Sequence, residues 1–543
     1  MKRSGLLWLS MLLLTASAYC QQFDVKRYDA AMATVLEKAY PASVRMWGFD
    51  TTTRQQMSAQ FSGVVVSADG YIFTAAHTTT PGQTYLVMFP DGKQAIAQAL
   101  GKIEMADDRT VPDVSMMKIV TPGVWPFAEI GYSSSLKEGV PCVSIAYPES
   151  LNQPLPTLRF GHIVTLHNEK GFIQSTCIME PGDSGGPLFD MLGRVIGLHS
   201  AIWNTEEFNF EIPVDLYRKY FTALKEAKKF NAFPTLEDKV DADKQAADIQ
   251  PWPQLKGAFT SVDAKLSQSC VSISSSKGKA QGAILEGGYI VSKSSQVSDT
   301  PEVFYNKRKL DAKVLRRDKL TDLVLLQMQT PVKGGVKINT GEPAAGIGQL
   351  LISPRAEQAG VMSVASNQAF SLPRVLSAGF FGASVPYKPG AVKISFIRAN
   401  SPAALAGLQV GDRIVSINQV VMDKPENYGN ELQRYWPGDT LTVAVERNDS
   451  TFSSRIVLTE KAAQPASGHP AESFPGGKSH RRDGLDPVFA HDAILQPEAC
   501  GGPVFDVNGH FKGINIARYS RTSTLAVPAS AVFRLVEQVR AGK

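Results

Sequence analysis

Apolar and polar residues alternate in many short runs between Ser43 and Val214, and glycine, proline or aspartate separates each run from the next. Clear examples are SVRMWGF, FSGVVVSADGYIFTAAH, DVSMMKIV, CVSIAYP, RFGHIVTL and GGPLFDMLGRVIGLHSAIW. Short alternating runs with regular turn signals predict strands that form β-barrels or β-sandwiches. A charged stretch from Asp215 to about Lys229 predicts a helix that closes this unit.

The same pattern returns in the second half of the chain. Two matches come from the first part of each copy: DGYIFTAAHTT (69–79) recurs as GGYIVSKSSQV (287–297), and PDVSMMKI (112–119) recurs as TDLVLLQM (321–328). Two more come from the last part: FDMLGRVIGLHSA (189–201) recurs as FDVNGHFKGINIA (505–517), and IPVDLYRKYF (212–221) recurs as VPASAVFRLV (527–536). Because these blocks recur in the same order, we predict two copies of one β-rich domain.

The second copy is interrupted by an extra segment, residues 376–460, which contains SPAALAGLQVGDRIVSINQ and a strand pair. A tract of low complexity follows it. The predicted organisation is a first domain (24–231), a linker (232–257), a split second domain (258–375 and 485–543), the inserted segment (376–460) and a second linker (461–484).

Composition narrows the class of protein. A chain of 543 residues has room for about three domains at roughly 150 residues each. Its apolar fraction of 43% and charged fraction of 20% are typical of globular proteins. A net charge of +5 and the lack of any base-reading motif argue against nucleic acid as a partner.

The N-terminus resembles a secretory signal peptide. Lys2 and Arg3 precede the apolar run 6–14, and small residues at 16–18 offer a cleavage site. The run is too short for the roughly 20 residues of a membrane span, and no later segment is long enough. We therefore predict a signal peptide over residues 1–20 and a mature chain in the periplasm or outside the cell. Lipid anchoring at Cys20 is disfavoured because Tyr19 is bulky.

Export permits disulfides, but the five cysteines are odd in number and widely scattered. Cys142, Cys177 and Cys270 are predicted to be buried free thiols.

The phrase GDSGGP offers chemistry for amide hydrolysis. Ser184 would be the nucleophile, and the N–H groups of Gly182 and Ser184 would stabilise the oxyanion. The base must come from elsewhere, and His77 ends the apolar run TAAH. Asp113, at the start of DVSMMKI, fits the carboxylate that orients this base.

The phrase recurs as PEACGGPVFD, with Cys500 in place of Ser184. The internal repeat puts Ser295 at the position of the base and Asp322 at that of the orienting carboxylate. A cysteine nucleophile needs a base or a lowered pKa, and neither is evident here. We predict a catalytically dead second copy, with a cysteine protease as the alternative.

TAAH, DVSMMKI and GDSGGPL, in this order, resemble a chymotrypsin-fold serine protease. GVVVSADGYIFTAAH is more similar to the exported bacterial HtrA/Deg branch, which pairs such a protease with a PDZ module. The resemblance covers about 43–221 and implies two six-stranded β-barrels with the site in the cleft between them. We therefore expect a mainly β protein with two chymotrypsin-like double β-barrel domains in tandem and a PDZ domain inserted in the second.

The resemblance also implies a specificity pocket. Ile178 would lie at its base, and Ser200 and Ile202 would form one wall. Such a pocket should accept small or medium aliphatic side chains and reject Lys or Arg, whose charge would be buried unpaired. The alternative is that Ile178 is a core residue.

The inserted segment resembles a PDZ domain, and GFFGASV (379–385) matches its carboxylate-binding loop. The N–H groups of Phe380, Phe381 and Gly382 would hold a peptide's C-terminal carboxylate while the peptide extends a sheet edge. The alternative is a purely structural β module.

We expect an exported serine endopeptidase whose partners are polypeptide substrates and, at the PDZ domain, peptide C-termini. The resemblance implies unfolded or damaged envelope proteins as substrates. No cofactor or metal is expected, and a homo-oligomer stays open. The alternative function is a non-catalytic periplasmic scaffold that binds peptides.

Overall fold

The computed structural model describes residues 24–105, 112–203, 205–241, 251–332, 334–339, 341–462, 469–472 and 474–542. The signal peptide predicted for residues 1–20, and Cys20 with it, lies outside these ranges. No described helix is both long and apolar enough to cross a membrane. Short 3-10 turns occur at Tyr40–Ala42, Ala76–Thr78, Ser267–Ser269, Ser294–Gln296 and Pro497–Ala499.

The described chain begins with helix α1 (Val25–Lys38). Asp24 caps this helix by accepting the Arg27 N–H at 3.2 Å. The buried face of α1 includes Tyr28, whose hydroxyl donates to the carbonyl of Gly348 at 2.8 Å. The N-terminal helix therefore contacts the second half of the chain.

The first sheet belongs to the first half of the chain and has the order β14-β6-β5-β1-β3-β4-β7, with β2 paired to β1. An additional pairing of β6 with β7 closes a ring of strands. The bounds are β1 (Ser43–Asp50), β2 (Gln55–Gln56), β3 (Phe61–Val65), β4 (Tyr71–Ala75), β5 (Thr84–Met88), β6 (Gln94–Glu104), β7 (Asp113–Ile119) and β14 (Lys229–Phe230).

A closed barrel follows, in the order β10-β13-β12-β11-β8-β9. Its strands are β8 (Pro141–Ala146), β9 (Thr157–Thr165), β10 (Ile173–Ser175), β11 (Pro187–Phe189), β12 (Val195–Ile202) and β13 (Asn209–Pro213). The prediction of β-barrels for this half is thereby confirmed.

The helix predicted from Asp215 to about Lys229 is shorter in the structure. It consists of α2 (Val214–Lys219) and α3 (Phe221–Leu224). The end of the predicted range instead enters β14, which pairs in parallel with the edge of β6. Backbone hydrogen bonds to β6 replace those of a last helical turn, so the prediction was too long at this end.

The second half begins with α4 (Trp252–Leu266), so residues at the end of the predicted linker (232–257) are helical. One seven-stranded sheet has the order β19-β18-β15-β16-β17-β21-β20. Its strands are β15 (Cys270–Ser275), β16 (Gly278–Leu285), β17 (Tyr289–Lys293), β18 (Glu302–Tyr305), β19 (Arg308–Leu310), β20 (Ala312–Asp318) and β21 (Leu323–Met328).

A second seven-stranded sheet, in the order β23-β22-β32-β33-β34-β31-β24, combines strands from before and after the inserted segment. They are β22 (Leu350–Arg355), β23 (Gln358–Val364), β24 (Phe370–Leu372), β31 (Leu485–His491), β32 (Pro503–Asp506), β33 (Phe511–Arg518) and β34 (Thr524–Pro528), followed by α7 (Ala529–Arg540).

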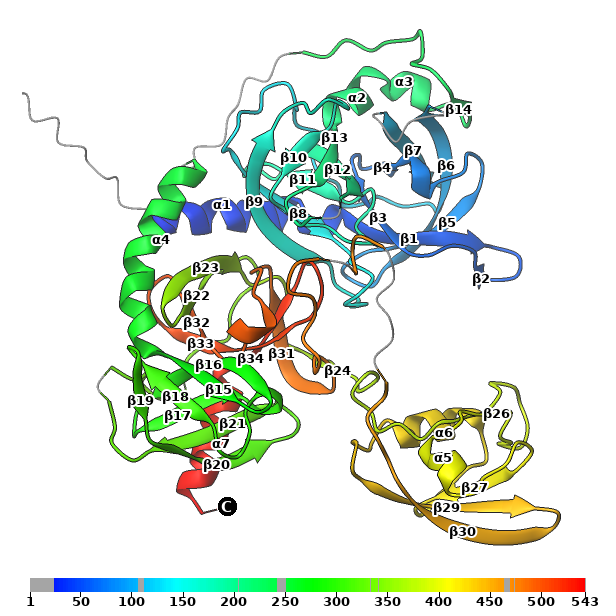
Figure 1. Ribbon diagram of the computed structural model, residues 1–543. Helices are drawn as coiled ribbons and strands as arrows, with labels where there is room; N and C mark the ends of the chain where they lie inside the picture. The colour runs from blue at the N-terminus through cyan, green and yellow to red at the C-terminus, as the bar shows by residue number, and fades with distance from the viewer. Residues whose placement is uncertain are drawn as a thin grey trace, which may run out of the picture.

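The inserted segment has its own buried apolar cluster and stands apart from both halves (Figure 1). It holds a two-stranded sheet and a four-stranded sheet of order β28-β27-β29-β30. Its elements are β25 (Ala383–Ser384), β26 (Phe396–Ile397), α5 (Pro402–Leu405), β27 (Arg413–Ile417), β28 (Val420–Val421), α6 (Pro425–Leu432), β29 (Thr440–Arg447) and β30 (Ser450–Val457).

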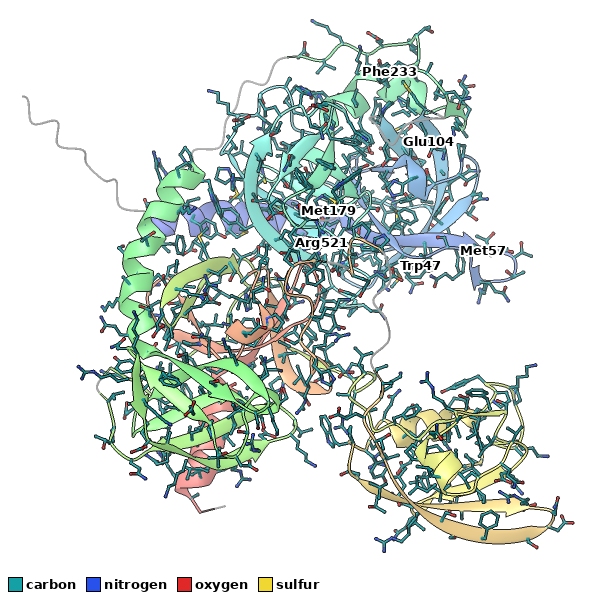
Figure 2. All side chains as sticks on the ribbon, viewed as in Figure 1. Trp47, Met57, Glu104, Met179, Phe233 and Arg521 are labelled. Carbon is teal, nitrogen blue, oxygen red and sulfur yellow. The ribbon has the colours of Figure 1, made fainter. Side chains whose placement is uncertain are left out.

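The two halves are joined by hydrogen bonds as well as by apolar contacts. The Leu158 N–H donates to the Ser366 carbonyl at 3.0 Å, and Arg521 Nη1 donates to the Trp203 carbonyl at 3.1 Å. Figure 2 labels Arg521 where the halves meet. One buried cluster contains residues of α1, β9 and α4 together with residues of β22 and β23. The halves therefore share a hydrophobic core.

The described cysteines, Cys142, Cys177, Cys270 and Cys500, are all free and buried. The prediction of buried thiols is confirmed.

Candidate active site

The GDSGGP phrase forms a tight turn immediately before β11. Gly182 and Gly185 have φ angles of +96° and +76°, which favour glycine. A Cβ at Gly182 would lie 2.5 Å from the Tyr147 carbonyl oxygen, and one at Gly185 would lie 2.0 Å from Thr74 Oγ1. Both glycines are therefore required by backbone geometry and by space, and the turn between them presents Ser184.

His77 and Asp113 come together because β4 and β7 are paired at the ends where these residues lie. His77 Nδ1 is 2.8 Å from Asp113 Oδ2, and the His77 backbone N–H donates to Asp113 Oδ1 at 2.9 Å. Burial lowers the pKa of His77, but the hydrogen bond to Asp113 and its negative charge outweigh this effect, so the pKa is raised above its ordinary value.

Ser200 gives Asp113 a further partner. Its hydroxyl donates to Asp113 Oδ2 at 2.6 Å. The carboxylate therefore receives hydrogen bonds from both His77 donors and from Ser200, which fixes its position. Sequence reasoning placed Ser200 in a pocket wall and missed this contact with Asp113.

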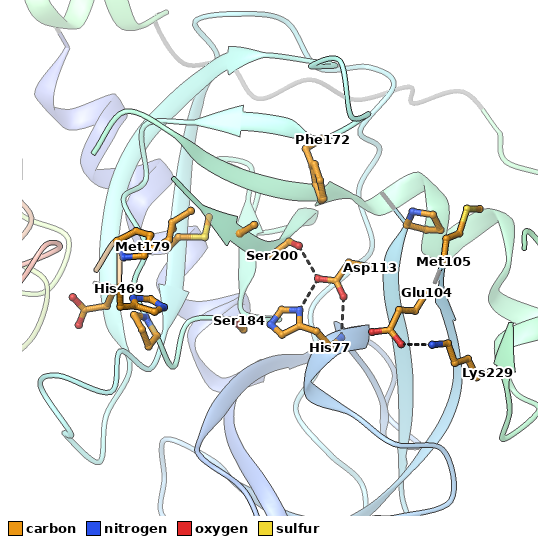
Figure 3. Close-up of a pocket in the computed structure, with 16 residues that line it drawn as sticks. His77, Glu104, Met105, Asp113, Phe172, Met179, Ser184, Ser200, Lys229 and His469 are labelled. Atoms are coloured by element: carbon orange, nitrogen blue, oxygen red, sulfur yellow. Dashed lines mark hydrogen bonds and ion pairs between the residues drawn. The ribbon is translucent and has the colours of Figure 1, made fainter. Parts of the chain in front are cut away.

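His77, Asp113 and Ser184 face one cavity of about 1010 Å³. Figure 3 shows the His77 ring between Asp113 and Ser184, pointing toward Ser184. The other lining residues are Glu104, Met105, Pro112, Phe172, Met179, Glu180, Pro181, Ser200, Ala201, Ile202, Lys229, His469 and Pro470. The three predicted catalytic side chains thus share a space large enough for a peptide segment.

A buried ion pair fixes the residue next to Ser184. Arg159 Nη1 on β9 lies 2.8 Å from Asp183 Oδ2, and the two side chains are 1% and 0% exposed. The same carboxylate accepts the Glu180 N–H at 2.9 Å and so closes the turn that carries Gly182. Burial raises the pKa of Asp183 to about 6, although the charge of Arg159 opposes this. Sequence reasoning missed this pair, whose signal was one arginine in the apolar run around β9.

Comparison with known proteins identifies relatives of two segments of the chain. A family model described as a trypsin-like peptidase domain matches residues 61–198, and one described as a PDZ domain matches residues 394–447. A "Probable periplasmic serine endoprotease DegP-like" of Pseudomonas savastanoi pathovar phaseolicola is 31% identical over 231 residues, which are 39% of this chain and 45% of the relative. "Serine protease HTRA1" of Xenopus tropicalis is 34% identical over 216 residues, which are 37% of this chain and 45% of the relative.

The chain is HtrA-like, with a trypsin-like peptidase domain and a PDZ domain. The resemblance to HtrA proteins that the motifs predicted is thereby confirmed. The chain spans about half the length of the curated relatives it matches. The solved structure "HtrA-type protease AlgW with decapeptide" aligns with 80% of this chain and 99% of its own, at 18% identity and a TM-score of 0.31.

The predicted specificity pocket is placed only in part. Ser200 and Ile202 line the cavity of the peptidase domain, whereas Ile178 is buried and is not among the lining residues. Its neighbour Met179 lines the cavity instead, as does Phe172. The lining is therefore apolar where Ile178 was expected, but other side chains provide it.

The second copy of the phrase lies in a different environment from the peptidase site. The Ser295 N–H donates to Asp322 Oδ1 at 2.9 Å, which matches the contact of His77 with Asp113. Asp322 Oδ2, however, accepts from Lys293 Nζ at 2.7 Å, and Arg481 Nη1 lies 3.0 Å from Asp322 Oδ1. The carboxylate of Asp322 is therefore paired with two cationic side chains, Lys293 and Arg481.

Cys500 is fully buried, and its Sγ lies 3.8 Å from Ser479 Oγ. Burial raises the pKa of the thiol, although the charge of Lys293 opposes this. A raised pKa and full burial both work against a cysteine nucleophile.

The predicted carboxylate loop of the PDZ domain is only partly available. The Phe380 N–H donates to the Thr459 carbonyl at 2.7 Å, so the expectation that it binds a ligand is wrong. The Phe381 side chain is buried in the domain core, and Gly382 has a φ of +87°. The loop therefore retains Phe381 and Gly382 as candidate donors.

A backbone carbonyl of the edge strand beside this loop also has a hydrogen-bond partner within the domain. The Tyr428 hydroxyl on α6 donates to the Ala383 carbonyl of β25 at 2.6 Å. Sequence reasoning gave no sign of this contact, which sits where an added peptide strand would need backbone partners.

Among the described residues, one group could hold a metal ion: Glu342, Asp506 and His510. Lys512 Nζ already lies 2.7 Å from Glu342 Oε1 and 3.5 Å from Asp506 Oδ2. The ammonium group of Lys512 therefore supplies the positive charge that a metal ion would otherwise provide between these two carboxylates.

Proposed function

We propose that the chain is an exported serine endopeptidase with Ser184 as nucleophile, His77 as general base and Asp113 as the residue that orients the base. The observation that carries this proposal is the 2.8 Å contact of His77 Nδ1 with Asp113 in the cavity that Ser184 lines.

In this mechanism, His77 Nε2 takes the proton of Ser184 Oγ as the oxygen attacks the substrate carbonyl carbon. The N–H groups of Gly182 and Ser184 stabilise the oxyanion of the tetrahedral intermediate. His77 then donates its proton to the leaving amine, and water hydrolyses the acyl-enzyme by the same route. Asp113 stays ionised and holds the imidazole through Nδ1.

The proposed substrates are polypeptides with a small or medium aliphatic residue before the scissile bond. Met179 and Ile202 line the cavity, and a buried Lys or Arg would lose its hydration there. Unfolded or damaged envelope proteins fit the resemblance to HtrA proteins and the periplasmic relative named above. A cleavage profile dominated by Lys or Arg would contradict this specificity.

For the second half, we propose a degenerate, non-catalytic copy of the peptidase domain. The strand order β15-β16-β17-β21 parallels β1-β3-β4-β7, which supports a shared origin. The cations around Asp322 and the buried thiol of Cys500 support the loss of catalysis.

A fluorophosphonate probe tests the function directly, because it labels a serine only when a base activates it. We expect the full chain to be labelled at Ser184. A folded chain that is not labelled there would favour a peptide-binding scaffold without catalytic activity.

A further inference from the structure

Part of the cavity wall comes from a distant segment of the chain. His469 and Pro470 line the cavity together with Met179 and Glu180, and Figure 3 shows His469 beside Met179. These two residues belong to the segment between the PDZ domain and β31. We call residues 469–472 and 474–483 of this segment the strap.

The strap is anchored at the degenerate site of the second half. Arg481 Nη1 lies 3.0 Å from Asp322 Oδ1, and Lys293 Nζ donates to the Arg481 carbonyl at 2.9 Å. Ser479 lies against Cys500. The residues that align with Asp113 and Ser184 thus contact the end of the strap.

Arg518 also holds the strap. The Ser479 N–H donates to the Arg518 carbonyl at 2.8 Å, and Ser479 Oγ accepts the Arg518 N–H at 2.9 Å. The Arg518 guanidinium lies 5.3 Å from the ring centre of Phe474, which is 7% exposed. The burial of Phe474 and the two hydrogen bonds of Ser479 restrict the movement of this part of the strap.

Arg518 also reaches the peptidase domain, where it forms an ion pair with Glu206. Glu206 lies in the loop from β12 to β13, which begins directly after the lining residue Ile202. Arg521 Nη2 donates to the Thr205 carbonyl of this loop at 2.6 Å. The second half therefore supports two walls of the cavity.

From these contacts we infer that His469 and Pro470 are specificity-determining residues of the peptidase site, positioned by the anchor of the strap at Asp322. This inference rests on the proposed function. Met179 leads into the oxyanion turn. The substrate side chain that precedes the scissile bond is therefore placed along the wall that Met179 shares with His469 and Pro470. His469 and Pro470 narrow the space there and exclude bulky side chains.

His469 is not a second base in this arrangement. Its Nδ1 accepts the Ala471 N–H at 3.1 Å, which fixes the ring by a contact within the strap. The role of His469 is therefore to shape the wall.

The test uses the full chain and two peptides that differ only in Val or Phe before the scissile bond. In the double variant His469→Ala/Pro470→Ala, kcat/KM for the Phe peptide should rise roughly tenfold relative to the Val peptide, a typical effect of a few methylenes in an apolar pocket. His480→Ala is the matched control, because His480 is an exposed strap residue that does not line the cavity, and it should leave the ratio unchanged.

The anchor is tested by Arg481→Met, which removes the ion pair with Asp322 and should shift the ratio in the same direction. Arg481→Lys should restore the ratio, and melting curves show whether each variant is folded.

An unchanged ratio in the His469→Ala/Pro470→Ala variant overturns the inference while fluorophosphonate labelling of Ser184 upholds the proposed function. An equal rise for both peptides also overturns it, because the strap would then only obstruct access. If Ser184 is not labelled in the wild type, both conclusions fall.

Discussion

Arg159 and Asp183 form an ion pair that is shielded from solvent and adjacent to the proposed nucleophile. Asp183 precedes Ser184 directly, and its carboxylate also accepts the Glu180 N–H. The position of the oxyanion turn therefore depends on a charge on β9, outside the turn itself.

Arg159→Met should leave an unpaired carboxylate in the interior. Breaking a buried ion pair typically costs about 3–5 kcal/mol of stability, and a misplaced oxyanion donor lowers turnover by about 10²–10³. Adding Asp183→Asn should recover part of both losses, because the amide is neutral and its oxygen can still accept the Glu180 N–H. Thermal melting and kcat/KM of both single variants and the double variant provide the test. A double variant no better than Arg159→Met would contradict this role.

Ser184→Ala should lower peptidase activity by roughly 10⁶, as expected when a triad nucleophile is removed. Cys500→Ala should leave activity nearly unchanged, because that thiol is buried and the polar group beside it is the hydroxyl of Ser479 rather than a base. Turnover of a fluorogenic peptide by each single variant and by the double variant distinguishes the two sites. Residual activity in Ser184→Ala that disappears with Cys500→Ala would overturn the proposal of a dead second copy.

The pH dependence of kcat/KM should report His77. The base must be neutral to accept a proton, and its raised pKa keeps it protonated to a higher pH. Activity should therefore rise with pH. The midpoint of this acid limb should lie above the ordinary histidine pKa of about 6.5. Ser200→Ala removes a donor to Asp113 and should move this limb further upward, since the carboxylate then holds the imidazolium more strongly. A limb below the ordinary value would contradict the assigned pairing.

The PDZ domain should bind peptides with a free, apolar C-terminal residue more tightly after Tyr428→Phe. This change removes the hydroxyl that occupies the Ala383 carbonyl, a hydrogen bond with a net contribution of about 0.5–1.5 kcal/mol. Affinity should rise by a few-fold to about tenfold in calorimetry. C-terminal amides are the control and should bind more weakly, because they lack the carboxylate. Equal affinity for acid and amide would show that the groove is wrongly assigned.

The sequence predicted the residues that meet through neighbouring strands or within one turn. His77 and Asp113 end paired strands, and glycines define the turn of Ser184, so short motifs were sufficient. Contacts such as that of Arg159 with Asp183 depend on packing between strands, which local periodicity does not encode. The same holds for His469. It belongs to a tract of low complexity, and its position depends on the contacts that the strap makes with the rest of the protein. The Phe380 N–H was misassigned because its partner, Thr459, lies at the far end of the inserted segment.

The Tyr28 hydroxyl on α1 and the apolar cluster around it join both halves of the chain. Two halves that each formed a separate core could unfold one after the other. Here the removal of either half would expose apolar surface of the other, including Phe160 on one side and Ile352 on the other. We therefore expect the two halves to unfold together, so that a mutation in the second half can reduce the amount of folded peptidase domain without touching its active site.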